Sequence, residues 1–199
     1  MVPRRSVLAA MVLCAIAARG LASVIAGAGP LALTRDVLEH SNTIVRGTDE
    51  RSRKLHDLSE LLRGFLDTEA LARLAADKHL AGRSEEEVRE FLTLFHEFFV
   101  RTYVQRLLLF DAPEFSYGKE TVDGDTARVA TEVVTPGDRF AVDYTLRREG
   151  DGWRATDIEV EGVSLAKNFR AQFDAAVAKD SFQGLLERLR AKVAAKPEA

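Results

Sequence analysis

The sequence predicts an α+β fold in which N-terminal helices, an antiparallel four-stranded curved meander and C-terminal helices enclose an apolar cavity. Apolar residues recur at helical spacing from residue 34 to about residue 110. Between residues 115 and 161 they alternate with polar residues, as in half-buried strands, and short turns separate the runs. The helical period then returns from residue 164. This order of elements is typical of an α+β domain, and a curved sheet wrapped by helices tends to leave a cavity between the layers.

The first 28 residues are predicted to be a signal peptide, which leaves residues 29–199 as a single domain. Arg4 and Arg5 precede an apolar run over residues 7–18, and this order of charge and hydrophobicity is typical of secretion signals. A remainder of this size is long enough to bury a sizeable core.

Small residues at the end of this segment offer places for cleavage. Residues 26–28 form an A-x-A-like site, and Ala22 is another option. Arg19 interrupts the apolar stretch, so we expect no membrane span, although an uncleaved N-terminal anchor remains an alternative. Cys14 is the only cysteine and lies inside the segment, so disulfides and thiol catalysis are excluded for the mature chain.

The charge balance argues against nucleic acid as a partner. Loss of the three arginines in the signal segment lowers the 28 basic residues to 25, against 31 acidic ones, a net charge of about −6. An acidic chain that lacks a long basic run is a poor binder of nucleic acid.

Three helices are expected before the longest one, at residues 34–46, 50–62 and 67–80. Asp67 is placed to cap the third of them. One side of the first helix carries Val37, Leu38, Ser41, Ile44 and Val45. The side of the third helix that we expect to face the core carries Leu71, Leu74 and Ala75.

The longest helix is predicted from Glu85 to about Phe110. Ser84 and Glu87 form a capping box at its start. Its wide apolar stripe needs cover on more than one side. The stripe includes Phe91, Phe95, Phe99, Tyr103 and Leu107.

Four strands joined by short turns are predicted next, and short connections of this kind make an antiparallel meander. The strands are expected at residues 115–122, 126–135, 139–148 and 153–161. One face of the second and third strands is apolar. That face carries Val129, Thr131, Val133, Phe140, Val142, Tyr144 and Leu146.

Two C-terminal helices are expected at residues 164–179 and 181–194. Gly162 ends the last strand, and Ser164 stands where an N-cap belongs. The same turn is similar to a relaxed nucleophile elbow, but that chemistry needs an acid and a histidine downstream, and the last histidine is His96. We therefore interpret Ser164 as a helix cap.

No metal or catalytic cluster is predicted. The histidines are His40, His56, His79 and His96. None pairs with another at metal-ligand spacing, so helical, partly exposed histidines are expected. Asp157, Glu159 and Glu161 share one strand face. Such carboxylates suit a cation or acid–base work, but a solvated strand face is the favoured interpretation.

The strand at Trp153, the acidic D-x-x-x-E-G-V-S junction from Asp157, the R-x-Q-F run from Arg170 and the F-x-x-x-F…T-Y helix from Phe91 stand in one order. Together they resemble the MlaC, or toluene-tolerance, family. That resemblance implies a periplasmic phospholipid-binding protein that serves an ABC lipid transporter and helps to maintain outer-membrane lipid asymmetry. It implies no cofactor, with phospholipid as cargo. The implied partners are an inner-membrane ABC transporter complex and an outer-membrane lipoprotein complex.

If the resemblance holds, the acyl chains lie between the long helix and the apolar face of the sheet. For any one residue there, plain core is the favoured interpretation, and only the set as a whole indicates a lipid pocket. The expected pocket residues are Phe91, Phe95, Phe99, Tyr103, Val129, Val133, Phe140, Val142 and Tyr144.

Two other classes of protein remain open. A small NTF2-like cavity enzyme, such as an isomerase, needs a buried acid or histidine in the cavity, whereas Asp143 and Asp157 are expected to point outward. A structural envelope protein needs only a filled core.

Overall fold

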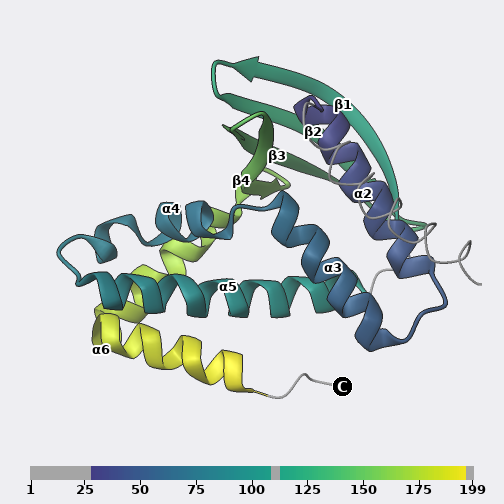
Figure 1. The fold of residues 1–199 in the computed structure, drawn as a ribbon. Coiled ribbons are helices and arrows are strands. Elements are labelled where there is room, and N and C mark those ends of the chain that lie inside the picture. Colours follow the sequence, from purple (N-terminus) through teal and green to yellow (C-terminus); the bar gives the residue numbers. More distant parts are fainter. Residues whose placement is uncertain (1–27, 109–112, 196–199) are drawn as a thin grey trace, which may run out of the picture.

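A computed structural model describes residues 28–108 and 113–195 of the protein (Figure 1). Nearly all of the predicted signal peptide, and the expected end of the long helix at Phe110, lie outside these residues. The helices before the sheet are α2 (Pro30–Arg46), α3 (Arg51–Phe65), α4 (Thr68–Leu80) and α5 (Glu85–Leu107). The sheet and α6 (Leu165–Ala194) follow, so the predicted order of helices, meander and helices is confirmed.

The sheet is an antiparallel meander in the order β1-β2-β3-β4-β5. Its strands are β1 (Glu114–Asp123), β2 (Thr126–Val134), β3 (Arg139–Glu149), β4 (Gly152–Val160) and β5 (Val163–Ser164). Four strands were expected, so the two-residue β5 is a correction. It forms because Glu161 and Gly162 both adopt positive φ, 50° and 76°, which folds the chain back onto β4.

The alternation of the strands places one face of the sheet against the core, as predicted. Val129, Thr131 and Val133 of β2 are buried while their neighbours are more exposed. Register irregularities interrupt β1 after Tyr117 and β3 after Thr145. Irregularities of this kind increase strand twist, and β1 and β2 arch beside α2 in Figure 1.

The sequence signals at most helix ends are confirmed. The Ser84 hydroxyl accepts from Glu87 N at 3.2 Å, and the Glu87 carboxylate accepts from Ser84 N at 3.1 Å, which completes the capping box. Asp67 caps α4 by accepting from Ala70 N at 2.9 Å. The first helix starts four residues earlier than predicted because Pro30 occupies its first turn, a favoured place for proline.

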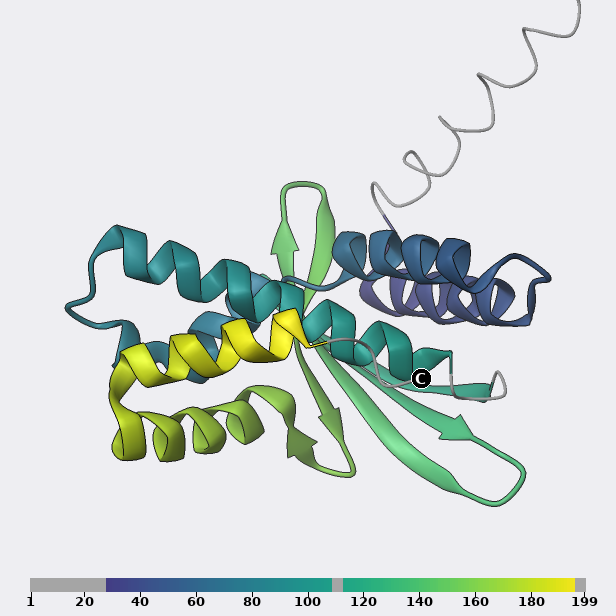
Figure 2. The same cartoon turned by 90° about the horizontal axis from the view of Figure 1, so that it is seen from below.

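Helix α6 bends sharply at Ser181, where φ is 74° and ψ is 175°. Its two halves correspond to the two predicted C-terminal helices. Figure 2 shows the halves running back alongside one another beside α5.

The inward face of α4 differs from the prediction at Leu74. Leu71 and Ala75 are completely buried, but Leu74 is 45% exposed. Ala72 and Ala76 are also completely buried, so the buried stripe is centred on the alanine side of the helix and Leu74 is rotated off it.

Among the described residues, none of the helices is long and apolar enough to cross a membrane.

Candidate functional site

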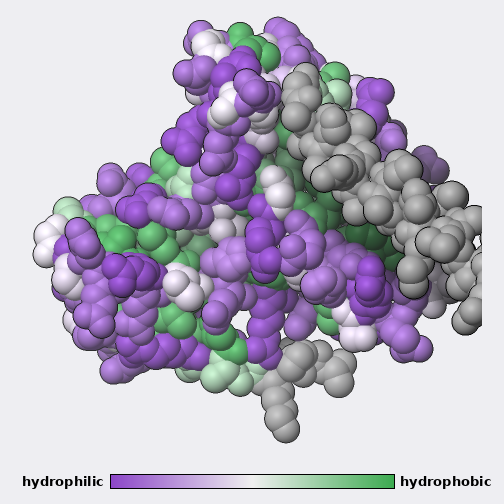
Figure 3. Space-filling model, viewed as in Figure 1, coloured by the Kyte–Doolittle hydropathy of each residue, from purple (hydrophilic) through white to green (hydrophobic). Residues whose placement is uncertain are grey.

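An apolar cavity of about 180 Å³ lies between α2 and the inner face of the sheet. Helix α2 forms one wall, β1 to β3 form the other, and Leu107 and Pro113 close one end. The lining residues are Leu38, Ser41, Asn42, Val45, Leu107, Pro113, Phe115, Val133, Phe140, Val142 and Tyr144. In Figure 3, hydrophobic side chains reach the surface in the recess between the sheet and the helices, within a largely hydrophilic exterior.

The polar side chains of α2 that face the cavity are bound to backbone carbonyls. The Ser41 hydroxyl donates to the Leu38 carbonyl in its own helix at 2.7 Å. The Asn42 amide donates to the Pro113 carbonyl at 2.6 Å and so joins the helix to the start of β1. These two side chains already have hydrogen-bond partners. Contact with an acyl chain therefore leaves few polar groups on this wall without a partner.

Tyr144 is the one aromatic hydroxyl among the described lining residues of the cavity. It is only 6% exposed, and its ring meets Phe65 edge-on with centroids 5.6 Å apart. Burial raises the pKa of the Tyr144 phenol well above its usual value, so the hydroxyl stays neutral at physiological pH. None of the described lining residues is an acid, a histidine or a cation. An NTF2-like enzyme needs such a group here.

The structure divides the expected pocket residues into two sets. Val133, Phe140, Val142 and Tyr144 line the cavity. The others lie elsewhere: Val129 is completely buried in the sheet core, and the aromatic residues of α5 are packed against α6. These aromatic residues are Phe91, Phe95, Phe99 and Tyr103.

The α5 aromatic residues form a closed cluster with Phe169 and Phe173 of α6. The ring centroids of Phe95 and Phe169 are 5.2 Å apart, and those of Phe91 and Phe173 are 5.6 Å apart, both edge-on. Ring contacts of this kind are typical of a packed aromatic core. The sequence interpretation missed the α2 wall, although Leu38, Ser41 and Val45 already stood on one side of the predicted first helix.

The acidic junction that leads from β4 to α6 caps the start of α6. The Asp157 carboxylate accepts from the Ser164 hydroxyl at 2.5 Å and from Ala166 N at 3.1 Å. Ser164 in turn accepts from Lys167 N at 3.1 Å, which confirms its assignment as the cap of α6. A cap acts through the lone pairs of the hydroxyl oxygen, and here they accept the Lys167 N–H.

The neighbouring carboxylates of β3 and β4 stay on the outer side of the sheet. Glu159 and Asp143 each accept from the Arg128 guanidinium at 2.9 Å. Glu161 accepts from Ala141 N. Solvated ion pairs of this kind fit the predicted outer face.

Two histidines hold helices together. His79 of α4 meets the Asp174 carboxylate of α6 at 2.6 Å, and His96 meets the Thr68 hydroxyl at 2.7 Å. Burial, followed by the positive charges of Arg63 and Arg154, lowers the pKa of His96. Within residues 28–108 and 113–195 no group of three or more His, Cys, Asp and Glu residues is arranged to hold a metal.

Comparison with known proteins gives a family and solved structures of similar fold. The family described as MlaC protein matches residues 35–191. No curated protein sequence matches significantly. A phospholipid-binding protein from Ralstonia solanacearum, solved in complex with a phospholipid, has a similar fold with a TM-score of 0.73 at 21% identity. The match covers 84% of this chain and 98% of that one.

Proposed function

The chain belongs to the MlaC family, and from this membership we propose that it is a periplasmic phospholipid carrier. The observation that carries the proposal is the uncharged, apolar cavity between α2 and the sheet. The similar fold of a protein solved with a bound phospholipid supports the same role. In this proposal the acyl chains contact Val133, Phe140, Val142 and Tyr144 on one side and α2 on the other.

The physical need for such a carrier is the cost of exposing hydrocarbon to water. Each exposed methylene costs about 0.8 kcal/mol. Two acyl chains with about 30 methylenes together therefore cost roughly 24 kcal/mol in water on that scale. A protein that moves phospholipid between membranes has to bury the chains, and this task needs no catalytic group or cofactor.

A bound phospholipid needs a wider cavity than the one described. Its 180 Å³ lies below the range of about 300–1,000 Å³ that is usual for small-molecule sites. Helix α2 is the wall best suited to move, because few polar contacts fix it to the sheet. Among these contacts, the Leu31 N–H donates to the Glu120 carboxylate at 2.5 Å, and the Asn42 amide donates to the Pro113 carbonyl. We propose that α2 moves outward as acyl chains enter.

The transport cycle follows from the family membership. Residues 1–28 would direct export to the periplasm as a signal peptide. The loaded protein would exchange phospholipid between an inner-membrane ABC transporter complex and an outer-membrane lipoprotein complex, and so help to keep the outer membrane asymmetric. The mature N-terminus in the envelope fraction tests the export step, since an intact Met1 on a cytoplasmic protein contradicts it.

Native mass spectrometry of gently purified protein tests the carrier function. A mass increment that matches phospholipid, released as intact lipid on extraction, is the expected result. Protein without lipid, under conditions that keep it folded, would support the filled-core envelope protein instead.

A further inference from the structure

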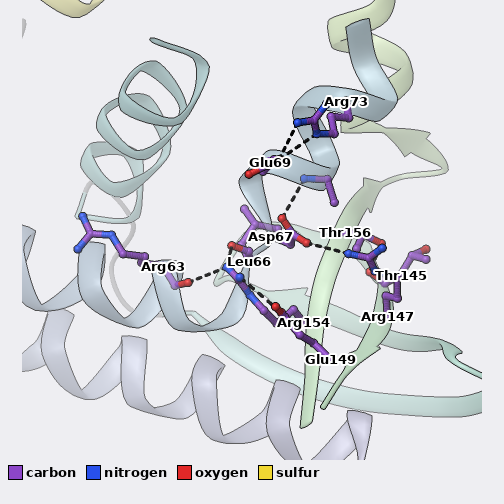
Figure 4. A network of polar contacts seen from close by, with 11 residues as sticks. Arg63, Leu66, Asp67, Glu69, Arg73, Thr145, Arg147, Glu149, Arg154 and Thr156 are labelled. Carbon is purple, nitrogen blue, oxygen red and sulfur yellow. Dashed lines mark hydrogen bonds and ion pairs between the residues drawn. The ribbon is translucent and has the colours of Figure 1, made fainter. Parts of the chain in front are cut away.

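A second, larger cleft of about 810 Å³ opens beside α4, away from the apolar cavity. Arg73 of α4, Arg147 of β3, Arg154 of β4 and Arg170 of α6 all line it. Four guanidinium groups from four separate elements therefore converge on one surface. Figure 4 shows three of them, Arg73, Arg147 and Arg154, around the start of α4. The cleft also contains Asp67, Glu69, Asp77 and Glu149, so its formal charge is balanced.

Hydrogen-bond donors nevertheless outnumber acceptors in this cleft, because each guanidinium carries five N–H groups. Arg147 has one ion-pair partner in the described part of the chain, Asp67 at 3.2 Å, and its side chain is 60% exposed. Arg73 directs its donors at a single oxygen of Glu69, 2.9 Å away. Arg154 is ion-paired with Glu149 at 3.5 Å and its Nε is buried, so it offers fewer donors to a ligand than Arg147 and Arg73 do. A ligand that fills the cleft therefore has to bring acceptors, and carboxylates match guanidinium groups best.

An apolar side chain lies among these arginines. Leu74 lines the cleft and is 45% exposed, although helical spacing predicts that it faces the core. Its backbone carbonyl accepts from Arg170, which holds the arginine against it. Arginine is among the residues enriched at protein interfaces relative to the rest of the surface.

The cleft also borders the segment between the end of α3 and the start of α4. Arg154 donates to the carbonyls of Arg63 at 3.0 Å and Leu66 at 2.8 Å, where α3 ends. Phe65, in the same turn, packs against Tyr144 of the cavity wall. A partner that fills the cleft thus lies beside the segment that joins α2 and α3 to the remaining helices.

From these observations we propose that the cleft is the docking surface for a partner protein, through a segment that carries carboxylates beside an apolar side chain. The inference rests on the proposed carrier function, because a carrier has to engage the complexes that load and unload it. The carboxylates take the remaining donors of Arg147 and Arg73, and the apolar side chain covers Leu74.

Site-specific photocrosslinking in cells tests the proposal on the full-length protein. A benzophenone amino acid replaces Leu74 in one variant and Val122 in the control. Val122 is similarly exposed, at 48%, but lies near the β1–β2 turn. We expect position 74, and not position 122, to capture an envelope protein whose crosslinked peptide contains Asp or Glu.

Charge reversal then tests the role of the arginines. Arg147→Glu should lower the yield of the adduct at position 74 about tenfold or more, as expected for an arginine inside an interface. Arg139→Glu is the matched control, because Arg139 lies on the same strand, is 63% exposed and is also ion-paired. Reversal of the partner's carboxylate to arginine should restore capture by Arg147→Glu. Circular dichroism and bound-lipid content, measured on each variant, should stay unchanged.

The remaining outcomes overturn the docking proposal. They are equal capture at both positions, a captured peptide without carboxylates, unchanged capture by Arg147→Glu, or label found on phospholipid instead of protein. If Arg147→Glu does not fold, Arg73→Glu, which changes another exposed arginine of the same cleft, provides the same test. Wild-type protein without bound lipid would overturn the carrier function separately, whatever the crosslinks show.

Discussion

Filling the cavity with a larger side chain should block phospholipid binding without unfolding the protein. Val142→Phe places a ring where Val142 lines the 180 Å³ cavity. The matched control is Val129→Phe, on the same face of the neighbouring strand, where Val129 is completely buried in filled core. Both positions are valine, but Val142 borders the empty cavity and Val129 is surrounded by packed side chains.

The expected costs follow from that difference in space. Overpacking a filled core costs about 1–3 kcal/mol, so Val129→Phe should lower the free energy of unfolding by that amount. At Val142 the ring enters empty volume and gains burial, worth up to about 1.5–3 kcal/mol for a fully buried phenylalanine, which offsets local crowding. We expect the stability of Val142→Phe to stay within about 1 kcal/mol of wild type.

Urea unfolding followed by circular dichroism gives the two stabilities, and lipid extraction from the same samples gives the occupancy. Val142→Phe should be folded and depleted of lipid, whereas Val129→Phe should be less stable and still loaded. If both variants are destabilised equally, or Val142→Phe retains its lipid, the cavity has been placed wrongly.

Two further predictions concern the polar contacts. Because burial lowers the pKa of His96, the folded state resists protonation more than the unfolded chain, whose value is near 6.5. The stability that neutral His96 contributes should therefore be complete above pH 6.5 and decrease as the pH falls toward the lowered pKa of the folded state. His96→Gln should make the urea midpoint of unfolding less dependent on pH in this range. An identical pH profile in the variant contradicts the assignment. Ser164→Ala removes the cap of α6 and should cost about 1 kcal/mol of unfolding free energy, with Ser164→Thr as the conservative control. An unchanged melting temperature for Ser164→Ala would show that the cap contributes nothing.

The local features of the fold could be predicted because they depend on neighbours in the chain. Ser84 with Glu87, Asp67 and Ser164 each place a hydrogen-bonding group beside a free backbone N–H. The alternation in β2 and β3 fixes which side chains face inward, since one face of an antiparallel sheet is buried.

The location of the cavity could not be predicted with the same certainty. Helical periodicity shows that Phe95 and Phe99 lie on a buried stripe, but it does not say whether α6 or the sheet covers that stripe. In the structure Phe169 of α6 covers it. The weaker stripe of α2, with Leu38 and Val45, faces the cavity instead. Such pairings depend on contacts between distant segments.

The central claim, that acyl chains lie between α2 and the sheet, is tested most directly with a phospholipid that carries a photoreactive diazirine in one acyl chain. The purified protein is loaded with this lipid, irradiated and digested, and the labelled residues are identified by mass spectrometry. The account predicts labels on cavity residues such as Leu38, Val133 and Val142. Failure to load, or labels concentrated on the α5–α6 aromatic residues such as Phe95 and Phe173, would contradict it.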